Sequence, residues 1–175
     1  MLVLRDMIEN DIEDYVIWFT RETEWGKWDS PWEAFESNED EERQSWTEYY
    51  NSVKNLPADV TRWKYEIELD GKHIGWICSY TDLDYVENKE NILAIGLDIP
   101  CEKDRKNGYG TKAFMMYMEY LKKHGHHSFY TQTWLGNLAM VRVAEKLGFK
   151  EMYRKTNYRE VDGKLYDAIT WRLDL

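Results

Sequence analysis

The residues best suited to chemistry form a short loop, which reads Arg105-Lys106-Asn107-Gly108-Tyr109-Gly110-Thr111. It follows an apolar run, Ile92–Ile99, and precedes a helical pattern, so its backbone amides gather at a helix start. Two glycines separated by one residue let the backbone turn tightly. Free N–H groups and the positive end of a helix dipole attract phosphate. The loop therefore predicts a pyrophosphate-binding site.

The spacing of the glycines separates this loop from two common phosphate motifs. A dinucleotide fingerprint requires G-x-G-x-x-G and a P-loop requires G-x-x-x-x-G-K-[ST], whereas Gly110 is followed by Thr111-Lys112-Ala113. The alternative is a plain strand-to-helix turn. Such a turn needs neither two glycines nor two neighbouring cations on an acidic chain, so phosphate binding is the better interpretation. Gly148, in contrast, needs no ligand, because glycine commonly ends a helix.

The composition predicts one domain over residues 1–175, because no Pro/Gly/Ser-rich linker divides the chain. No apolar stretch is long enough for a membrane span, and no secretory signal is visible, so we expect a cytoplasmic location. The net charge of -10 argues against nucleic acid as a partner. The two cysteines, Cys78 and Cys101, fit neither a zinc motif nor a disulfide framework. We expect no metal.

Most of the excess acidity lies between Arg21 and Glu48, and part of this segment is rich in tryptophan: Glu24-Trp25-Gly26-Lys27-Trp28-Asp29-Ser30-Pro31-Trp32-Glu33. Aromatic faces and carboxylates together attract cationic amines. The alternative is that the tryptophans pack a small satellite core and the acids form a solvated surface.

The hydrophobic pattern predicts an α/β (α+β) chain in the order β-α-α-β-β-β-α-β-α-β-β. A first helix is predicted to begin at a capping box of Asn10 and Glu13. The expected strands are Leu2–Arg5, 63–69, 74–80, Ile92–Ile99, Phe129–Thr133, Phe149–Arg159 and Leu165–Leu173. Helices are expected after Asn10 and over about Asp40–Val53, Gly110–Lys123 and Asn137–Leu147, with loop or short helical pieces over Arg21–Ser37, a loop at Glu87–Glu90 and turns at Asp70-Gly71 and Asp162-Gly163.

Two motifs in this order resemble those of the GNAT (GCN5-related N-acetyltransferase) superfamily. The first is the R-x-x-G-x-G of the loop. The second runs from Asn137 through Glu145-Lys146-Leu147-Gly148-Phe149, about thirty residues later. The resemblance covers nearly the whole chain. It implies a central mixed, mostly antiparallel sheet of about seven strands, splayed between strands four and five and flanked by about four helices.

The resemblance also implies acetyl-CoA as cofactor. Its pantetheine arm would lie along the backbone of Leu97, Asp98 and Ile99, and its pyrophosphate would lie on the loop residues Arg105, Lys106, Asn107, Gly108, Tyr109, Gly110 and Thr111. Asn137 matches the family's asparagine near the cofactor arm. It could equally be an N-cap, and one side chain could serve both roles.

Two positions depart from the family pattern for proton transfer. Many members carry Glu and Tyr where this chain has Ala94 and Ala144. Asp98 shares the strand face of Ala94 by alternation, which makes it the first candidate for a catalytic base. Its alternative is a solvent-facing carboxylate at a strand end. Tyr109, Tyr130 and Tyr153 are unranked candidates for the acid.

The Ala144 and Glu145-Lys146 pattern and the Trp-rich insertion look most like the RimJ/RimL branch. This predicts an N-acetyltransferase that acts by direct attack in a ternary complex, on an aminoglycoside, polyamine or protein N-terminal amine. The expected acceptor-binding residues are Trp25, Trp28, Asp29, Trp32 and Glu33. A non-catalytic acyl-CoA-binding module and a plain partner-interaction protein are the alternatives, and the sequence leaves monomer and homodimer open.

Overall fold

The computed structural model describes residues 1–86 and 92–175, so the loop predicted at Glu87–Glu90 lies outside the described residues. Within these ranges seven strands form one sheet in the order β1-β2-β3-β4-β5-β7-β6. All neighbours are antiparallel except β4 and β5. The strands are β1 (Leu2–Arg5), β2 (Lys64–Leu69), β3 (Lys72–Tyr80), β4 (Ala94–Asp98), β5 (Ser128–Trp134), β6 (Lys150–Val161) and β7 (Lys164–Asp174).

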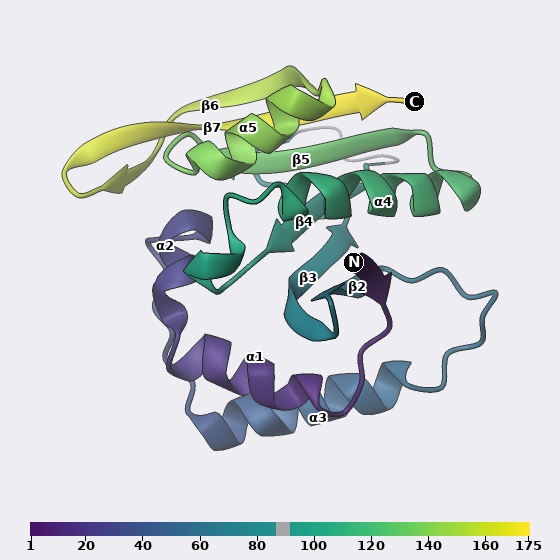
Figure 1. Cartoon of the computed structure of the whole chain (residues 1–175). Helices are drawn as coiled ribbons and strands as arrows, with labels where there is room; N and C mark the ends of the chain where they lie inside the picture. Colours follow the sequence, from purple (N-terminus) through teal and green to yellow (C-terminus); the bar gives the residue numbers. More distant parts are fainter. Residues whose placement is uncertain (87–91) are drawn as a thin grey trace.

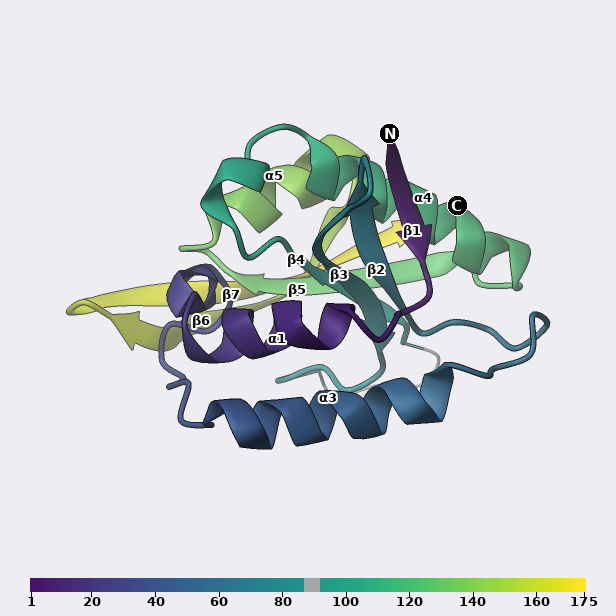
Figure 2. The same ribbon diagram turned by 60° about the horizontal axis from the view of Figure 1, so that its bottom comes forward.

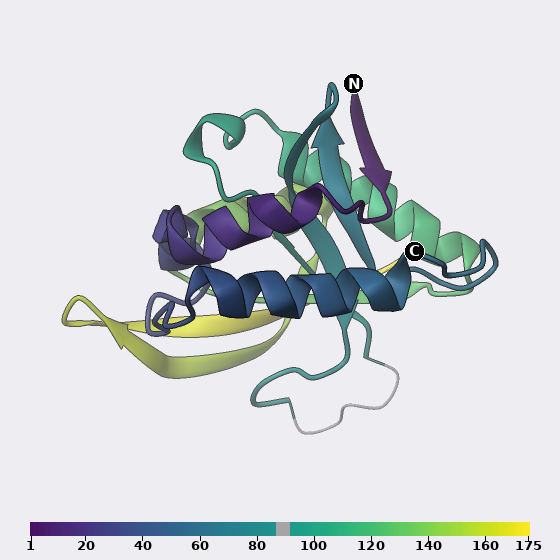
Figure 3. The ribbon, with the colours of Figure 1, turned by 90° about the horizontal axis from the view of Figure 1, so that it is seen from below.

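Helices cover both faces of this sheet (Figures 1 and 2). One face carries α4 (Tyr109–Lys123) and α5 (Leu138–Leu147), and the other carries α1 (Asp11–Thr20) and α3 (Glu39–Val53). Figure 3, a view from below, shows α1 and α3 side by side in front of the strands. The two are joined by the one-turn pieces η1 (Thr23–Trp25) and α2 (Gly26–Asp29), while η2 (Glu102–Asp104) follows β4. The predicted α/β sheet is therefore confirmed, with the one-turn α2 as a fifth helix. None of the described helices is both long and apolar enough to cross a bilayer.

The main core lies between the sheet and α4. Phe114, Tyr117 and Leu121 recur at helical spacing and are fully buried against Ile77 and Ile95. Burial of such side chains stabilises the fold by about 1.5–3 kcal/mol each. This layer fixes α4 against β4, and hence fixes the loop at the start of α4.

A second core, under α1 and α3, is rich in aromatic rings. Tyr15, Trp18, Trp25 and Trp76 are buried there, and the Trp46 ring stacks on Tyr15 with 3.7 Å between centroids. Edge-to-face and stacked pairs add about 0.5–1.5 kcal/mol beyond the area they bury. Of the three tryptophans in the Trp-rich segment, Trp25 lies in this core, as the alternative interpretation expected, whereas Trp28 and Trp32 do not.

The sheet opens between β4 and β5. Ala94 pairs with Tyr130, and the Tyr130 N–H donates to the Leu93 carbonyl at 2.9 Å, but no later residue of β4 pairs with β5. In contrast, β3 pairs with β4 from Trp76 to Tyr80. The splay expected between the fourth and fifth strands is thus present, and the β5-facing edge of β4 lacks a strand partner beyond Ala94.

The predicted capping box at Asn10 is wrong. Asn10 has helical backbone angles (φ -64°, ψ -23°), and its side chain makes no capping bond. An N-cap needs a non-helical backbone, so that its side chain can reach the free amides of the first turn. The capping box is found instead in α3, where Asn38 is extended and pairs reciprocally with Glu41.

The last hairpin is longer than predicted, because β6 continues to Val161 and β7 begins at Lys164. The turn falls at Asp162-Gly163, as expected, and both residues have positive φ (50° and 75°). This conformation suits Asp and Gly at the tip of a two-residue turn.

Candidate active site

A pocket of about 550 Å³ opens where β4 and β5 diverge. It is bounded by the end of β4, the loop after it, the start of α4 and one side of α5. All predicted cofactor residues except Asn107 line it. The lining comprises Trp25, Trp28, Leu97, Asp98, Ile99, Glu102, Asp104, Arg105, Lys106, Gly108, Tyr109, Gly110, Thr111, Asn137, Leu138, Ala139, Met140, Arg142, Val143 and Lys146.

Gly108 and Gly110 are glycines for different structural reasons. Gly108 adopts φ +79°, a left-handed conformation that favours glycine, immediately before α4. Gly110 has an ordinary φ but lies close to β4, since a Cβ added there would be 3.3 Å from Leu97 Cδ1. The Lys112 N–H donates to the Gly108 carbonyl, so the amides of Tyr109 to Thr111 precede the first intrahelical bond of α4. These donors belong to residues that line the pocket.

The Arg105 and Asn107 side chains of the loop donate hydrogen bonds to other groups of the protein. The Arg105 guanidinium donates to the Ile99 carbonyl at 2.7 Å, to the Pro100 carbonyl and to Glu24. The Asn107 amide donates to the carbonyls of Lys103 and Arg105. Lys106 lies 3.9 Å from Glu102 and is largely exposed. The loop therefore offers backbone donors, while Arg105 and Asn107 brace its shape.

Two further cations line the pocket from α5, and the sequence analysis missed them. Arg142 and Lys146 are one turn apart on α5. Neither makes an ion pair within the described parts of the chain. The sequence could have indicated this pair, because residues at i and i+4 share a helix face. Two cations on one face of an acidic protein suggest an anion-binding surface. Nearby, Asn137 Oδ1 accepts the Met140 N–H at 3.1 Å, so this side chain caps α5.

Within the described residues, Asp98, the last residue of β4, is one of the three acidic residues that line the pocket, with Glu102 and Asp104. Burial, together with the Asp29 carboxylate, raises the pKa of Asp98 to about 8, and Arg105 opposes the shift only in part. The pKa of Asp29 is also raised, by desolvation and by Glu33. A carboxylate with a pKa near neutrality can hold a proton or accept one at physiological pH.

The predicted acceptor residues lie along one segment at the pocket's edge. Trp25 is buried, and Trp28 is 41% exposed; both line the pocket. Asp29, Trp32 and Glu33 do not line it. The Trp28 carbonyl accepts the Trp134 indole N–H at 2.9 Å. Trp32 packs edge-on against Trp134 and Tyr158.

The three candidate tyrosines are now separated by position. Tyr109 lines the pocket at the start of α4, whereas Tyr130 is buried and Tyr153 packs against the small cluster that contains it. A fourth, Tyr80, was missed. Its ring passes over Gly96 of β4, 3.4 Å from where a Cβ would lie, and burial raises its pKa above the ordinary value.

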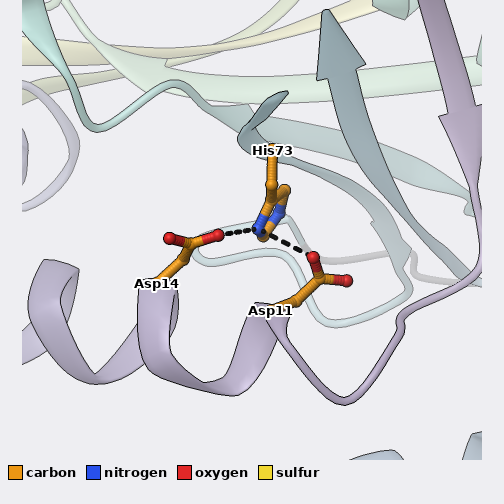
Figure 4. A group of neighbouring side chains, drawn as sticks. All are labelled: Asp11, Asp14 and His73. Carbon is orange, nitrogen blue, oxygen red and sulfur yellow. Dashed lines mark hydrogen bonds and ion pairs between the residues drawn. The ribbon is translucent and has the colours of Figure 1, made fainter. Parts of the chain in front are cut away.

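A second group of acids gathers around His73, far from the loop in sequence (Figure 4). His73 Nδ1 lies 3.0 Å from Asp14 and 3.3 Å from Asp11, and Nε2 lies 3.1 Å from Glu66. Desolvation alone would lower the pKa of His73, but the three carboxylates outweigh it and raise the pKa to about 9.

Asp11, Asp14 and His73 are close enough to hold a metal ion. However, both Asp11 oxygens already accept hydrogen bonds from Arg5, at 2.6 and 2.7 Å, and the imidazolium lies between the acids. The cations of the chain itself therefore satisfy this cluster.

Comparisons with known proteins agree with the fold. Residues 1–150 match the family model described as an acetyltransferase (GNAT) domain. The chain therefore belongs to the GNAT acetyltransferase family. No curated protein matches it.

Solved structures resemble it over 99% of its length. They include a GNAT-family acetyltransferase from Bacillus anthracis (TM-score 0.71, 17% identity, 94% of that chain). A ribosomal-protein-alanine N-acetyltransferase from Brucella melitensis gives a TM-score of 0.67 at 16% identity over 99% of its chain. RimL, a ribosomal alpha-N-protein acetyltransferase in complex with coenzyme A, gives 0.71 at 14% identity over 94% of its chain. At these identities the likeness shows the fold.

Proposed function

We propose that this chain, as a single domain over residues 1–175, transfers an acetyl group from acetyl-CoA to a cationic primary amine by direct attack in a ternary complex. The observation that carries the proposal is the pocket itself. Within residues 1–86 and 92–175, it combines a β4 edge without a strand partner beyond Ala94, the amides at the start of α4 and two cations on α5 that make no ion pair. That RimL, a protein of the same fold, binds coenzyme A supports this choice of cofactor.

The donor set fits acetyl-CoA. The β4 edge at Leu97, Asp98 and Ile99 would hold the amide-bearing arm, because an extended chain can add to an unpaired strand edge. Amides from Gly108 to Thr111 would hold the pyrophosphate. Arg142 and Lys146 supply positive charge for the remaining phosphate. The cofactor supplies an activated thioester, and the protein supplies position and proton transfer.

Asp98 is the proposed proton acceptor. An amine must be uncharged to attack, and a lysine-like amine has an ordinary pKa near ~10. Asp98 has a pKa of about 8, so it is a far better base than an ordinary carboxylate and remains only partly ionised at neutral pH. A cationic amine bound beside Asp29 and Asp98 would favour the ionised form of both acids.

The acceptor is proposed to enter along the segment from Glu24 to Glu33. Trp28 presents an exposed ring at the pocket, and Asp29 contributes negative charge felt at Asp98. A ring and a carboxylate together favour a cation over a neutral molecule. Aminoglycosides, polyamines and N-terminal peptides share this chemistry.

A non-catalytic acyl-CoA-binding module is the second candidate. It is favoured by Ala94 and Ala144, which stand where many family members carry the base and the acid. A turnover screen of acetyl-CoA against aminoglycosides, polyamines, amino acids and N-terminal peptides separates the two. Amine-dependent release of thiol supports the enzyme, whereas tight coenzyme A binding without turnover for any amine supports the module.

The pocket is tested by Gly110→Asp. We expect coenzyme A affinity to fall at least about 100-fold, because the new carboxylate would lie against the phosphates in a partly desolvated site. Gly110→Ala is the matched control. It adds the same Cβ near Leu97 without charge and should lose far less affinity. Calorimetry measures both, and equal affinities of the Asp variant and the wild type would refute the proposed phosphate site.

A further inference from the structure

The segment Thr23–Glu33, here called the bridging segment, contacts both sides of the opening between β4 and β5. On the β4 side, Glu24 pairs with Arg105 at 3.1 Å. On the β5 side, the Trp134 indole N–H donates to the Trp28 carbonyl at 2.9 Å. The bridging segment therefore spans the two strands that diverge. It also contributes Trp25 and Trp28 to the pocket.

The β4-side contact is made by a well-held guanidinium. Arg105 Nε donates to the Ile99 carbonyl at 2.7 Å, and a second nitrogen donates to the Pro100 carbonyl. The Arg105 side chain is 17% exposed, while Glu24 is 52% exposed. Because the planar fork of arginine is already fixed by two carbonyls, it can hold Glu24 in one place at little further entropic cost. A lysine would lack this geometry.

Arg105 also belongs to the loop that lines the pocket. The residues after it, from Lys106 to Thr111, carry the amides proposed to grip the phosphates. A ligand that orders this loop would therefore order the guanidinium, and through Glu24 it would order the start of the bridging segment. Two sites that stabilise the same arrangement of one element are thermodynamically coupled in both directions.

We propose that Arg105 is a positioning residue, whose ion pair with Glu24 couples occupancy of the cofactor pocket to the order of the bridging segment that receives the amine. This inference rests on the proposed function. In this proposal Arg105 couples the two sites and does not itself neutralise a phosphate. Glu24 binds Arg105 and does not bind the acceptor amine.

The test is hydrogen exchange with and without coenzyme A, followed over residues 105–111 and over the bridging segment. In the wild type both regions should be protected by the ligand. In Glu24→Gln, residues 105–111 should remain protected, while the added protection of the bridging segment should fall by about two- to fivefold, as expected for a partly exposed ion pair. Arg105→Lys should behave like Glu24→Gln at the bridging segment, because a point charge does not restore the fork.

Glu13→Gln is the matched control, since it removes a carboxylate from another exposed ion pair, that with Arg43, whose residues do not line the pocket. It should leave the protection of both regions unchanged. Equal protection of the bridging segment in the wild type and in Glu24→Gln would overturn the coupling, because it would mean that the ligand protects Trp25 and Trp28 by direct contact alone. If coenzyme A protects neither region in the wild type, the proposed function fails instead.

Once an acceptor amine is known, kinetics give a second readout. Glu24→Gln should raise the KM for the amine by about two- to fivefold with kcat unchanged, and should do so less at high salt. A fall in kcat with unaltered KM would contradict a positioning role.

Discussion

Glu66 and Asp98 occupy one row of the sheet, on either side of Trp76, yet their surroundings differ sharply. Glu66 pairs with Trp76 in the β2–β3 register, and Trp76 pairs with Asp98 in the β3–β4 register. Glu66 accepts the Tyr15 hydroxyl at 2.6 Å, lies 3.1 Å from His73 and lies 3.6 Å from Lys64. Asp98, in contrast, makes no ion pair within the described residues, and the charged group with the largest effect on its pKa is another carboxylate, that of Asp29.

This contrast separates structural acids from candidate catalytic acids. Around Glu66 each carboxylate meets a cation or a hydroxyl of the protein, so the charges serve to hold α1 on the β2–β3 hairpin. Around Asp98, which lines a pocket, Arg105 compensates the negative charge only in part. A group in that position has its pKa displaced toward neutrality and is available to a ligand.

Among the variants that test this contrast between Glu66 and Asp98, Asp11→Asn should have the largest effect. The variant leaves Arg5 and the His73 imidazolium without their shared buried carboxylate, so we expect the free energy of unfolding to fall by about 3 kcal/mol or more. Urea denaturation at pH 7 measures the loss. A change below about 0.5 kcal/mol would show that this network is not structural.

The charge state of His73 gives a pH dependence of similar size. Its pKa in the folded protein, about 9, lies above the ordinary 6.5, so the protonated ring stabilises the fold. That contribution is complete below pH 6.5 and is lost as the pH rises through 9, a loss of about 3 kcal/mol. Stability curves of the wild type and of His73→Gln should therefore differ at pH 6 and converge near pH 10. Parallel curves would argue against a charged His73.

Asp98→Asn should separate activity from stability. We expect kcat to fall about 100-fold, because an amide cannot accept the proton of the amine. Folding should not suffer. The raised pKa of Asp98 means that ionisation destabilises the native state as the pH rises from about 4 to 8, so the variant should be more stable than the wild type at pH 9. Asp14→Asn is the control from the other cluster, with lower stability and unchanged kcat.

The smallest effect is expected for the double variant Asp29→Asn, Glu33→Gln. Loss of two charges on the segment that follows the pocket-lining Trp28 should raise the KM for a cationic amine by about three- to tenfold and leave coenzyme A affinity alone. Initial-rate kinetics at two salt concentrations would show it. An unaltered KM would place these acids on the solvated surface.

The sequence predicted those parts of the site that depend on local backbone. Gly108 and Gly110 define the loop because a left-handed turn and a close approach to β4 each need glycine, and both needs are encoded within a few residues. The order of elements was predicted for the same reason, since alternation and helical spacing are local patterns. The wrong prediction at Asn10 also concerned local geometry. A sequence that matches the capping-box pattern does not by itself determine the backbone angles of its first residue.

Long-range partners were not predictable in the same way. His73 lies 59 residues from Asp14, and Arg105 lies 81 residues from Glu24; no spacing rule joins them. The direction of the Arg105 side chain was therefore missed, and so was the ionic network under α1. Arg142 and Lys146 were missed for another reason, because their helix was interpreted by its motif and not by the face that it presents.

Within the described residues, Ala94 and Tyr130 are the one register pair between β4 and β5, and beside it the Tyr130 N–H donates to the Leu93 carbonyl. The sheet thus consists of two half-sheets, β1 to β4 and β5 with β7 and β6, that are joined by a short ladder. A ligand bound between the two half-sheets would contact both of them and stabilise the folded state. The melting temperature would then rise with the concentration of that ligand. The stability of this protein in a cell would therefore depend on the local concentration of its ligand.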